Sequence, residues 1–170
     1  SLPAGFCASV FADDLGTARH LVVNTNSDVY VALQSEHGRG AIAALRDTDG
    51  DGRADIVKYF GAARGTSGIG IHDGYLYFAT PTEVLRYKLQ PGQLVPQSPP
   101  HLVVGGFPEQ HVHAAKSFAF DTAGHLYVNV GAPSNSCQQD DRSPGSPGIR
   151  PCPLLEQHGG LWQFDANRTG

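Results

Sequence analysis

The sequence predicts an all-β fold, a β-propeller of which this chain holds about three four-stranded blades. Three short runs of β-branched and aromatic residues each follow a turn sequence, which is typical of strands. Their matching tyrosines, Tyr30, Tyr77 and Tyr127, stand 47 and then 50 residues apart. A repeat of that length is typical of propeller blades, and no segment shows a convincing helical spacing of apolar residues.

Each of the three units pairs its tyrosine-containing strand with a second strand beyond a turn or loop. The expected strands are 29–33 and 41–45 in the first unit, 75–80, 84–87 and 102–104 in the second, and 126–130 and 161–164 in the third. The alternation of apolar residues also favours an extended segment over 112–120. We therefore place the blades at about 1–60, 61–110 and 111–170 of one partial propeller domain.

A long insertion at 131–159 separates the two strands of the third unit. Long segments without strands in compact domains are usually functional loops. Three blades cannot close a ring, because propellers typically have about four to eight. The chain is therefore expected to be a piece of a longer protein. The alternative is a ring assembled from two copies.

The composition excludes several classes of protein. Charged residues are 16% of the chain and the formal net charge is −4, which excludes the clustered Lys and Arg of a nucleic-acid binder. Apolar residues are 40%, too many for a disordered chain. No apolar run approaches the roughly 18 residues of a membrane span. The start at Ser1 shows no signal peptide, as expected of a chain that is not exported or of a mature or trimmed form.

The three cysteines suggest one disulfide. Cys137 and Cys152 bracket a loop rich in Pro, Gly and Ser, with no Cys or His at zinc-finger spacing. A disulfide closing this loop is the preferred interpretation, and it implies an oxidising compartment, periplasmic or secreted. Cys7 is then either a buried thiol or the partner of a cysteine outside this chain.

An acidic loop at 47–55 has the pattern of a calcium site. Oxygen ligands at alternate positions, with a glycine at the sixth, allow a short loop to wrap a hard cation. Four carboxylates within nine residues repel one another unless a cation binds. The alternative is a solvated turn, and any bound Ca²⁺ is expected to be structural because the loop joins two blade strands. The expected ligands are Asp47, Asp49, Asp51, the Arg53 carbonyl and Asp55.

The motif His111-Val112-His113 is the strongest catalytic candidate. Alternate residues of a strand point to the same face, so both imidazoles could reach one site. An imidazole with an ordinary pKa near 6.5 suits removal of a hydroxyl proton near neutral pH. The alternative is a pair of polar loop histidines.

Several segments resemble the glucose/sorbosone dehydrogenase family, in its sorbosone-dehydrogenase-like branch. They are 2–6, 45–55, 113–131, 133–137 and 160–165, which together run over nearly the whole chain. The resemblance covers the N-terminal half of that family. It implies a six-bladed propeller that binds pyrroloquinoline quinone and Ca²⁺ and oxidises sugars.

The resemblance also implies roles for single residues. His113 matches the catalytic histidine, which takes a hydroxyl proton while hydride passes to the quinone. The family usually carries Arg after this histidine, whereas Lys116 and Ser117 stand here. A tight turn is the alternative for the glycine-rich stretch around Ser67. The expected cofactor-binding residues are His111, Lys116, Ser67 and Gly68.

Two hypotheses follow for the function. In the first, the chain is the N-terminal half of a quinone-dependent dehydrogenase of a sugar, an aldose or a sorbosone-like aldehyde, with His113 as general base. In the second, it is a non-catalytic, calcium-stabilised propeller module for binding or scaffolding. The remaining blades would come from the same or another chain, so this chain alone is not expected to catalyse the reaction.

Overall fold

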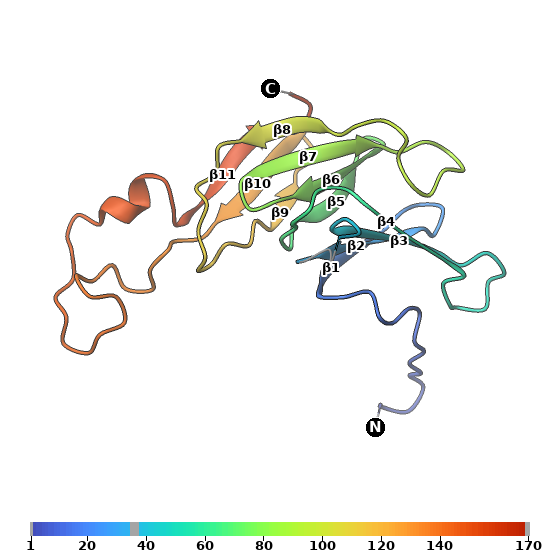
Figure 1. Ribbon diagram of the computed structural model, residues 1–170, viewed down its shortest axis with the longest axis horizontal. Helices are drawn as coiled ribbons and strands as arrows, with labels where there is room; N and C mark the ends of the chain where they lie inside the picture. The colour runs from blue at the N-terminus through green and yellow to red at the C-terminus, as the bar shows by residue number, and fades with distance from the viewer. Residues whose placement is uncertain (1, 35–37, 169–170) are drawn as a thin grey trace.

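The computed structural model describes residues 2–34 and 38–168, which form three antiparallel sheets (Figure 1). Each sheet takes its strands in chain order. The first sheet holds β1 (Ala18–Val23), β2 (Val29–Leu33), β3 (Ile42–Arg46) and β4 (Ile56–Phe60); the second holds β5 (Ile69–His72), β6 (Tyr75–Ala79), β7 (Glu83–Lys88) and β8 (His101–Gly105); the third holds β9 (Phe118–Phe120), β10 (His125–Val130) and β11 (Gly160–Asp165).

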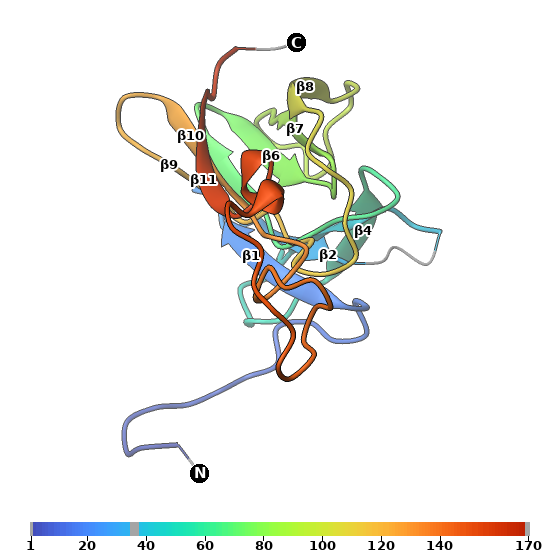
Figure 2. The same cartoon turned by 90° about the vertical axis from the view of Figure 1, so that its left-hand side faces the viewer.

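The first strands of the three sheets lie side by side, since β1 contacts β5 and β5 contacts β9 (Figures 1 and 2). The other strands follow outward from these inner strands, as in the blades of a propeller. Because successive strands run antiparallel, one end of the sheets carries three connecting segments. These are the loops 61–68 and 106–117 and the insertion after β10. The acidic loop 47–55 joins β3 to β4 at the opposite end.

The expected all-β class is confirmed, with two local differences. The third sheet holds three strands among the described residues, one fewer than expected. The segment expected to be extended over 112–120 is a strand only at 118–120, because His113 has a φ of 53°, a left-handed conformation that ends an extended segment. The one helix of the described chain is the 3₁₀ turn η1 (Pro153–Glu156), and no described helix is long and apolar enough to cross a membrane.

Two of the repeating tyrosines connect consecutive sheets. Tyr30 of β2 and Tyr77 of β6 are completely buried. The Tyr30 hydroxyl donates to the Leu94 carbonyl, in the loop between β7 and β8 of the second sheet, at 3.0 Å. The Tyr77 hydroxyl donates to the Ala166 carbonyl beyond β11 at 2.9 Å. Each tyrosine therefore packs its ring between two sheets and satisfies its buried hydroxyl on the later one.

Apolar side chains alternate along the middle strands and fill both faces of the first two sheets, whereas the third sheet buries one face. In β6, Leu76 and Phe78 pack toward the first sheet, whereas Tyr77 and Ala79 pack toward the third. A strand buried on both faces in this way reads as a continuous apolar run. The outer face of the first sheet packs against residues of the N-terminal segment, including Phe11 and Leu15.

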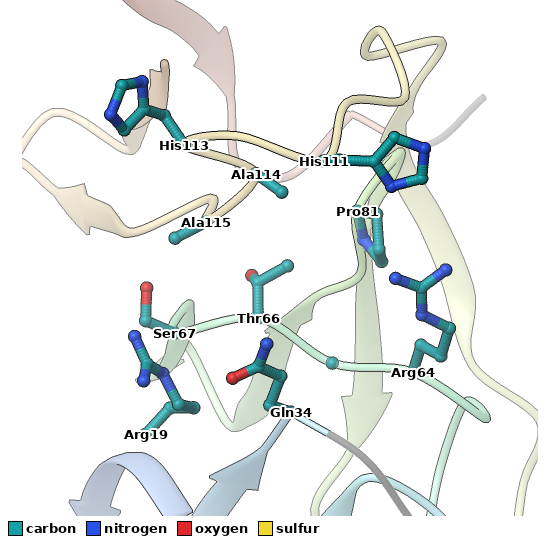
Figure 3. A pocket seen from close by; sticks show the side chains of 11 residues that line it. Arg19, Gln34, Arg64, Thr66, Ser67, Pro81, His111, His113, Ala114 and Ala115 are labelled. Atoms are coloured by element: carbon teal, nitrogen blue, oxygen red, sulfur yellow. The ribbon is translucent and has the colours of Figure 1, made fainter. Parts of the chain in front are cut away.

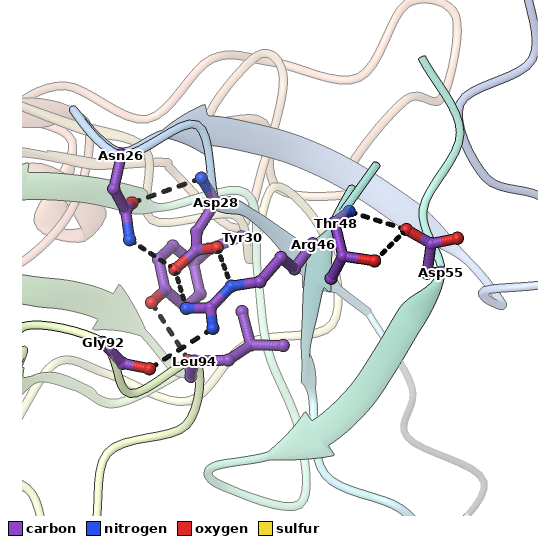
Figure 4. A network of polar contacts seen from close by, with 8 residues as sticks. All are labelled: Asn26, Asp28, Tyr30, Arg46, Thr48, Asp55, Gly92 and Leu94. Carbon is purple, nitrogen blue, oxygen red and sulfur yellow. Dashed lines mark hydrogen bonds and ion pairs between the residues drawn. The ribbon is translucent and has the colours of Figure 1, made fainter. Parts of the chain in front are cut away.

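An ion pair within the first sheet places an arginine that also reaches the second sheet (Figure 4). Arg46 donates from Nε and Nη2 to the two carboxylate oxygens of Asp28, at 2.6 and 2.7 Å, and from Nη1 to the Gly92 carbonyl at 3.3 Å. Burial alone would raise the pKa of Asp28, but the hydrogen bonds from Arg46 and Asn26 outweigh it and lower this pKa. The Asp28 side chain is 1% exposed, so its charge depends on these partners.

The variant Asp28→Asn should lower the free energy of unfolding by about 2 kcal/mol at pH 7, because it removes a charged acceptor from a buried, two-point hydrogen bond. Since the pKa of Asp28 is lowered in the folded state, this stabilisation is present at neutral pH and is lost as the pH falls below about 4. Urea unfolding at pH 7 and pH 3 measures both effects. Asp13→Asn, at an exposed position, is the control; equal unfolding midpoints for the two variants at pH 7 would contradict the prediction.

The insertion is closed by the expected disulfide between Cys137 and Cys152. Inside the loop, an isolated bridge pairs Gln138 with Gly148. Asp141 accepts hydrogen bonds from the hydroxyls of Ser134 and Ser136, at 2.5 and 3.3 Å.

Cys7 is exposed, so the interpretation of it as a buried thiol is wrong.

A thiol titration of the denatured, unreduced chain should find one reactive cysteine, Cys7, and three after reduction. Substitution of Cys7 by Ser should lower both numbers by one. Three thiols before reduction would show that the loop is open and would remove the argument for an oxidising compartment.

Candidate functional site

A pocket of about 240 Å³ lies where the inner strands begin (Figure 3). All three sheets contribute to it, through the segments that precede or follow their first two strands. The lining residues are Arg19 of β1, Gln34 after β2, Arg64, Gly65, Thr66 and Ser67 before β5, Pro81 after β6, and His111, His113, Ala114 and Ala115 before β9.

Thr66 joins the two loops that form most of the wall. Its buried hydroxyl donates to the Ala79 carbonyl at 3.1 Å and accepts from the Lys116 backbone N–H at 3.3 Å. Next to it, the hydroxyls of Ser67 and Ser117 lie 2.8 Å apart. These contacts hold the loop 61–68 of the second sheet against the loop 106–117 of the third.

His113 is held in one tautomer by the backbone. Its Nδ1 lies 2.7 Å from the carbonyl oxygen of Ala132, the second residue of the insertion. A carbonyl oxygen only accepts, so Nδ1 carries the proton and, in the neutral ring, Nε2 carries the free electron pair. The side chain is exposed, which leaves Nε2 able to meet a ligand.

The two histidines of the motif both line the pocket, but they do not share the face of a strand. Figure 3 shows the His111 ring beside Pro81 and above Arg64, whereas the His113 ring lies at the other end of the segment and turns away from it. Both imidazoles therefore border one pocket, but not from the same face of a strand as expected, since 111–113 is a bend. Ser67, between Thr66 and the inner strand, lines the pocket.

Two arginines give the pocket a positive character that the sequence analysis missed. Arg19 lies at the start of the first inner strand, and Arg64 opens the second loop. Arg64 has a distant partner in Glu109, at 3.7 Å and with both side chains 66% exposed, so this pair is weak. No carboxylate lines the pocket within the described chain. In the sequence, the only sign that Arg64 belongs to this pocket is its position beside the glycine-rich stretch.

Lys116 and Gly68 lie behind the pocket wall instead of lining it. Lys116 is completely buried, and its Nζ donates to the Ala114 carbonyl at 3.0 Å. Burial lowers the pKa of Lys116. Gly68 is also buried, and a side chain there would collide with the Lys116 carbonyl and lie 2.6 Å from the Ala79 methyl group. In this chain both residues support the wall by close packing.

The acidic loop brings three of its carboxylates together at the other end of the first sheet. Ligand oxygens of Asp47, Asp49 and Asp55 all lie within 4.8 Å of one another. Asp51 does not belong to this group and accepts from the Arg53 backbone N–H at 2.8 Å. Three hard carboxylate oxygens at this separation fit a hard cation such as Ca²⁺.

Hydrogen bonds also preorganise this loop. Backbone N–H groups of Gly52 and Gly50 donate to Asp47, at 2.9 and 2.7 Å, and lower its pKa. The Thr48 hydroxyl and backbone N–H both donate to Asp55 at 2.6 Å and lower the pKa of that carboxyl (Figure 4). Both carboxylates are therefore kept ionised, as a cation ligand must be.

Known structures share this fold. The pyrroloquinoline-quinone domain of a pyranose dehydrogenase from Coprinopsis cinerea matches with a TM-score of 0.71 and 12% identity, over 93% of this chain and 36% of that one. A family AA12 carbohydrate-active enzyme from Trichoderma reesei matches with a TM-score of 0.71 and 14% identity, over 93% and 38%. A putative glucose dehydrogenase from Thermus thermophilus matches with a TM-score of 0.53 and 19% identity, over 90% and 45%.

These likenesses confirm the propeller fold. The chain spans little more than a third of the length of the first two structures. No curated protein matches its sequence. Residues 1–167 match the family described as TrAA12-like, which agrees with the expected resemblance to quinone-dependent sugar dehydrogenases. Because this match covers nearly the whole chain, the chain belongs to the TrAA12-like family.

Proposed function

We propose that this chain is an N-terminal part of a quinone-dependent sugar dehydrogenase, shorter than the expected half of the matched structures, and that its pocket supplies the general base. The proposal rests on one observation: Arg19, Arg64 and His113 line the same pocket, and the Ala132 carbonyl sets the tautomer of His113. The family and the fold of its neighbours support the same reaction class. The substrate class is a sugar, an aldose or a sorbosone-like aldehyde.

The residues of the pocket fit an anionic quinone. Pyrroloquinoline quinone carries three carboxyl groups, and guanidinium groups bind carboxylates through charged, two-point hydrogen bonds. Arg19 and Arg64 would hold these groups, and Ser67 and Gln34 could donate further hydrogen bonds. When bound, the quinone supplies a two-electron acceptor for a hydride.

His113 would act on the substrate. With its proton on Nδ1 held by the Ala132 carbonyl, Nε2 can accept the proton of a sugar hydroxyl, which leaves the ring positively charged. The carbonyl then stabilises the charged ring through the same hydrogen bond. His111 lies at the opposite side of the pocket and would bind or orient the ligand.

The variant His113→Gln, made in the longer polypeptide that carries the remaining blades, should lower kcat about 10²- to 10⁴-fold, because glutamine cannot accept the proton. Quinone binding, followed by absorbance, should change little. The matched control is His158→Gln, since the Nδ1 of His158 also lies within hydrogen-bond distance of a carbonyl, that of Leu154, but outside the pocket.

Full turnover by His113→Gln would contradict the role of the base. A wild-type polypeptide that takes up Ca²⁺ but no quinone would instead favour the non-catalytic propeller module.

We further propose that the acidic loop binds a structural Ca²⁺ through Asp47, Asp49 and Asp55. Its place at the end of the sheet opposite to the pocket supports a stabilising role and not a catalytic one.

The disulfide supports an oxidising compartment, and we infer that the protein works outside the cytosol.

Adding Ca²⁺ at about 100 times its Kd should raise the free energy of unfolding by about 2.7 kcal/mol, because only the folded loop brings the carboxylates together. Asp49→Asn should abolish most of this increase, since it removes one charged ligand. Asp140→Asn, an exposed control in the insertion, should retain it. Calorimetry with and without Ca²⁺ measures the effect, and an equal increase in both variants would exclude this loop.

A further inference from the structure

We propose that Gln110 is a positioning residue that sets the tautomer and direction of His113. This inference rests on the proposed function, because the position of the Nε2 electron pair of His113 affects catalysis only if that ring is the base. Gln110 does not line the pocket, and it is 9% exposed. It acts on the pocket only through the backbone that carries His113.

Three carbonyl oxygens converge on the side-chain amide of Gln110. Its Nε2 lies 2.8 Å from the Val112 oxygen, 2.9 Å from the His113 oxygen and 3.1 Å from the Gly131 oxygen. Carbonyl oxygens only accept, so the NH₂ end of the amide must face them, and its two hydrogens are shared among the three. Two of the acceptors belong to the histidine loop, and the third belongs to the first residue of the insertion.

This amide holds a conformation that is unfavourable in isolation. His113 has a φ of 53°, in the left-handed region that a side chain with a Cβ rarely adopts. The hydrogen bonds from Gln110 to the carbonyls of Val112 and His113, which lie just before and just after this backbone conformation, keep the loop left-handed at His113. The Oε1 of Gln110 is buried and accepts no hydrogen bond in the described chain, so the amide stabilises the loop through its NH₂ end alone.

Gly131 allows the two segments to approach closely. A Cβ at this position would collide with the His113 carbonyl and lie 2.6 Å from the His113 Cβ. The next carbonyl along the chain, that of Ala132, is the one that lies 2.7 Å from Nδ1 of His113. Gln110 therefore joins the histidine loop to Gly131. The residue after Gly131 is Ala132, whose carbonyl sets the tautomer of His113.

The test is the ¹⁵N spectrum of the His113 ring in this chain at a pH about two units above the ordinary imidazole pKa. The wild type should show the Nδ1–H tautomer. Gln110→Glu keeps the shape of the side chain and, as a carboxylate, cannot donate. It should lower the ratio of Nδ1–H to Nε2–H about fivefold or more, the change expected when one neutral hydrogen bond is lost. The matched control is Gln163→Glu on exposed β11, which should leave the ratio unchanged.

An unchanged ratio in a folded Gln110→Glu variant would overturn the proposal, as would a wild-type ring in the Nε2–H form. If Gln110→Glu does not fold, Gln110→Met takes its place, because its side chain has a similar length and cannot donate a hydrogen bond. It should give the same loss of the Nδ1–H form, and an unchanged ratio would again overturn the proposal. The spectrum needs no quinone, so a failure to bind quinone would refute the proposed function and leave this result standing.

Discussion

The structure depends most on the burial of one tyrosine ring between each pair of consecutive sheets. The second sheet has two apolar faces, and neither can be left in water without a large loss of stability. Tyr30 and Tyr77 occupy equivalent places in β2 and β6, and each donates its hydroxyl to a carbonyl of the following sheet. The apolar ring provides the packing, and the hydroxyl avoids the cost of a buried unpaired donor.

This packing determines where the pocket forms. Because the sheets stack face to face, their inner strands β1, β5 and β9 begin at one place, and the loops before β5 and β9 meet there. Thr66 then ties the two loops together from behind by accepting from the Lys116 backbone N–H, and the buried Lys116 side chain holds the Ala114 carbonyl of its own loop. The two ends of the sheets consequently have different chemistry, with arginines and histidines at one and the acidic loop at the other.

Regular elements could be predicted from the sequence because they follow a local rule. Strands such as β2 and β10 are short runs of β-branched and aromatic residues, and the tyrosine spacing gave their repeat. The loop around His113 could not be predicted, because its left-handed residue depends on Gln110 and Gly131, which no periodic pattern connects. Arg19 was missed as a site residue since it lies far in sequence from the histidines it joins in the pocket.

In the proposed function, one pocket holds both the quinone and the base. A crystal structure of the longer polypeptide soaked with pyrroloquinoline quinone tests it most directly. We expect quinone density between the loops 61–68 and 106–117, with its carboxylates on Arg19 or Arg64 and with Nε2 of His113 facing the open side. Quinone bound elsewhere, or a His113 ring whose Nδ1 has left the Ala132 carbonyl, would contradict it.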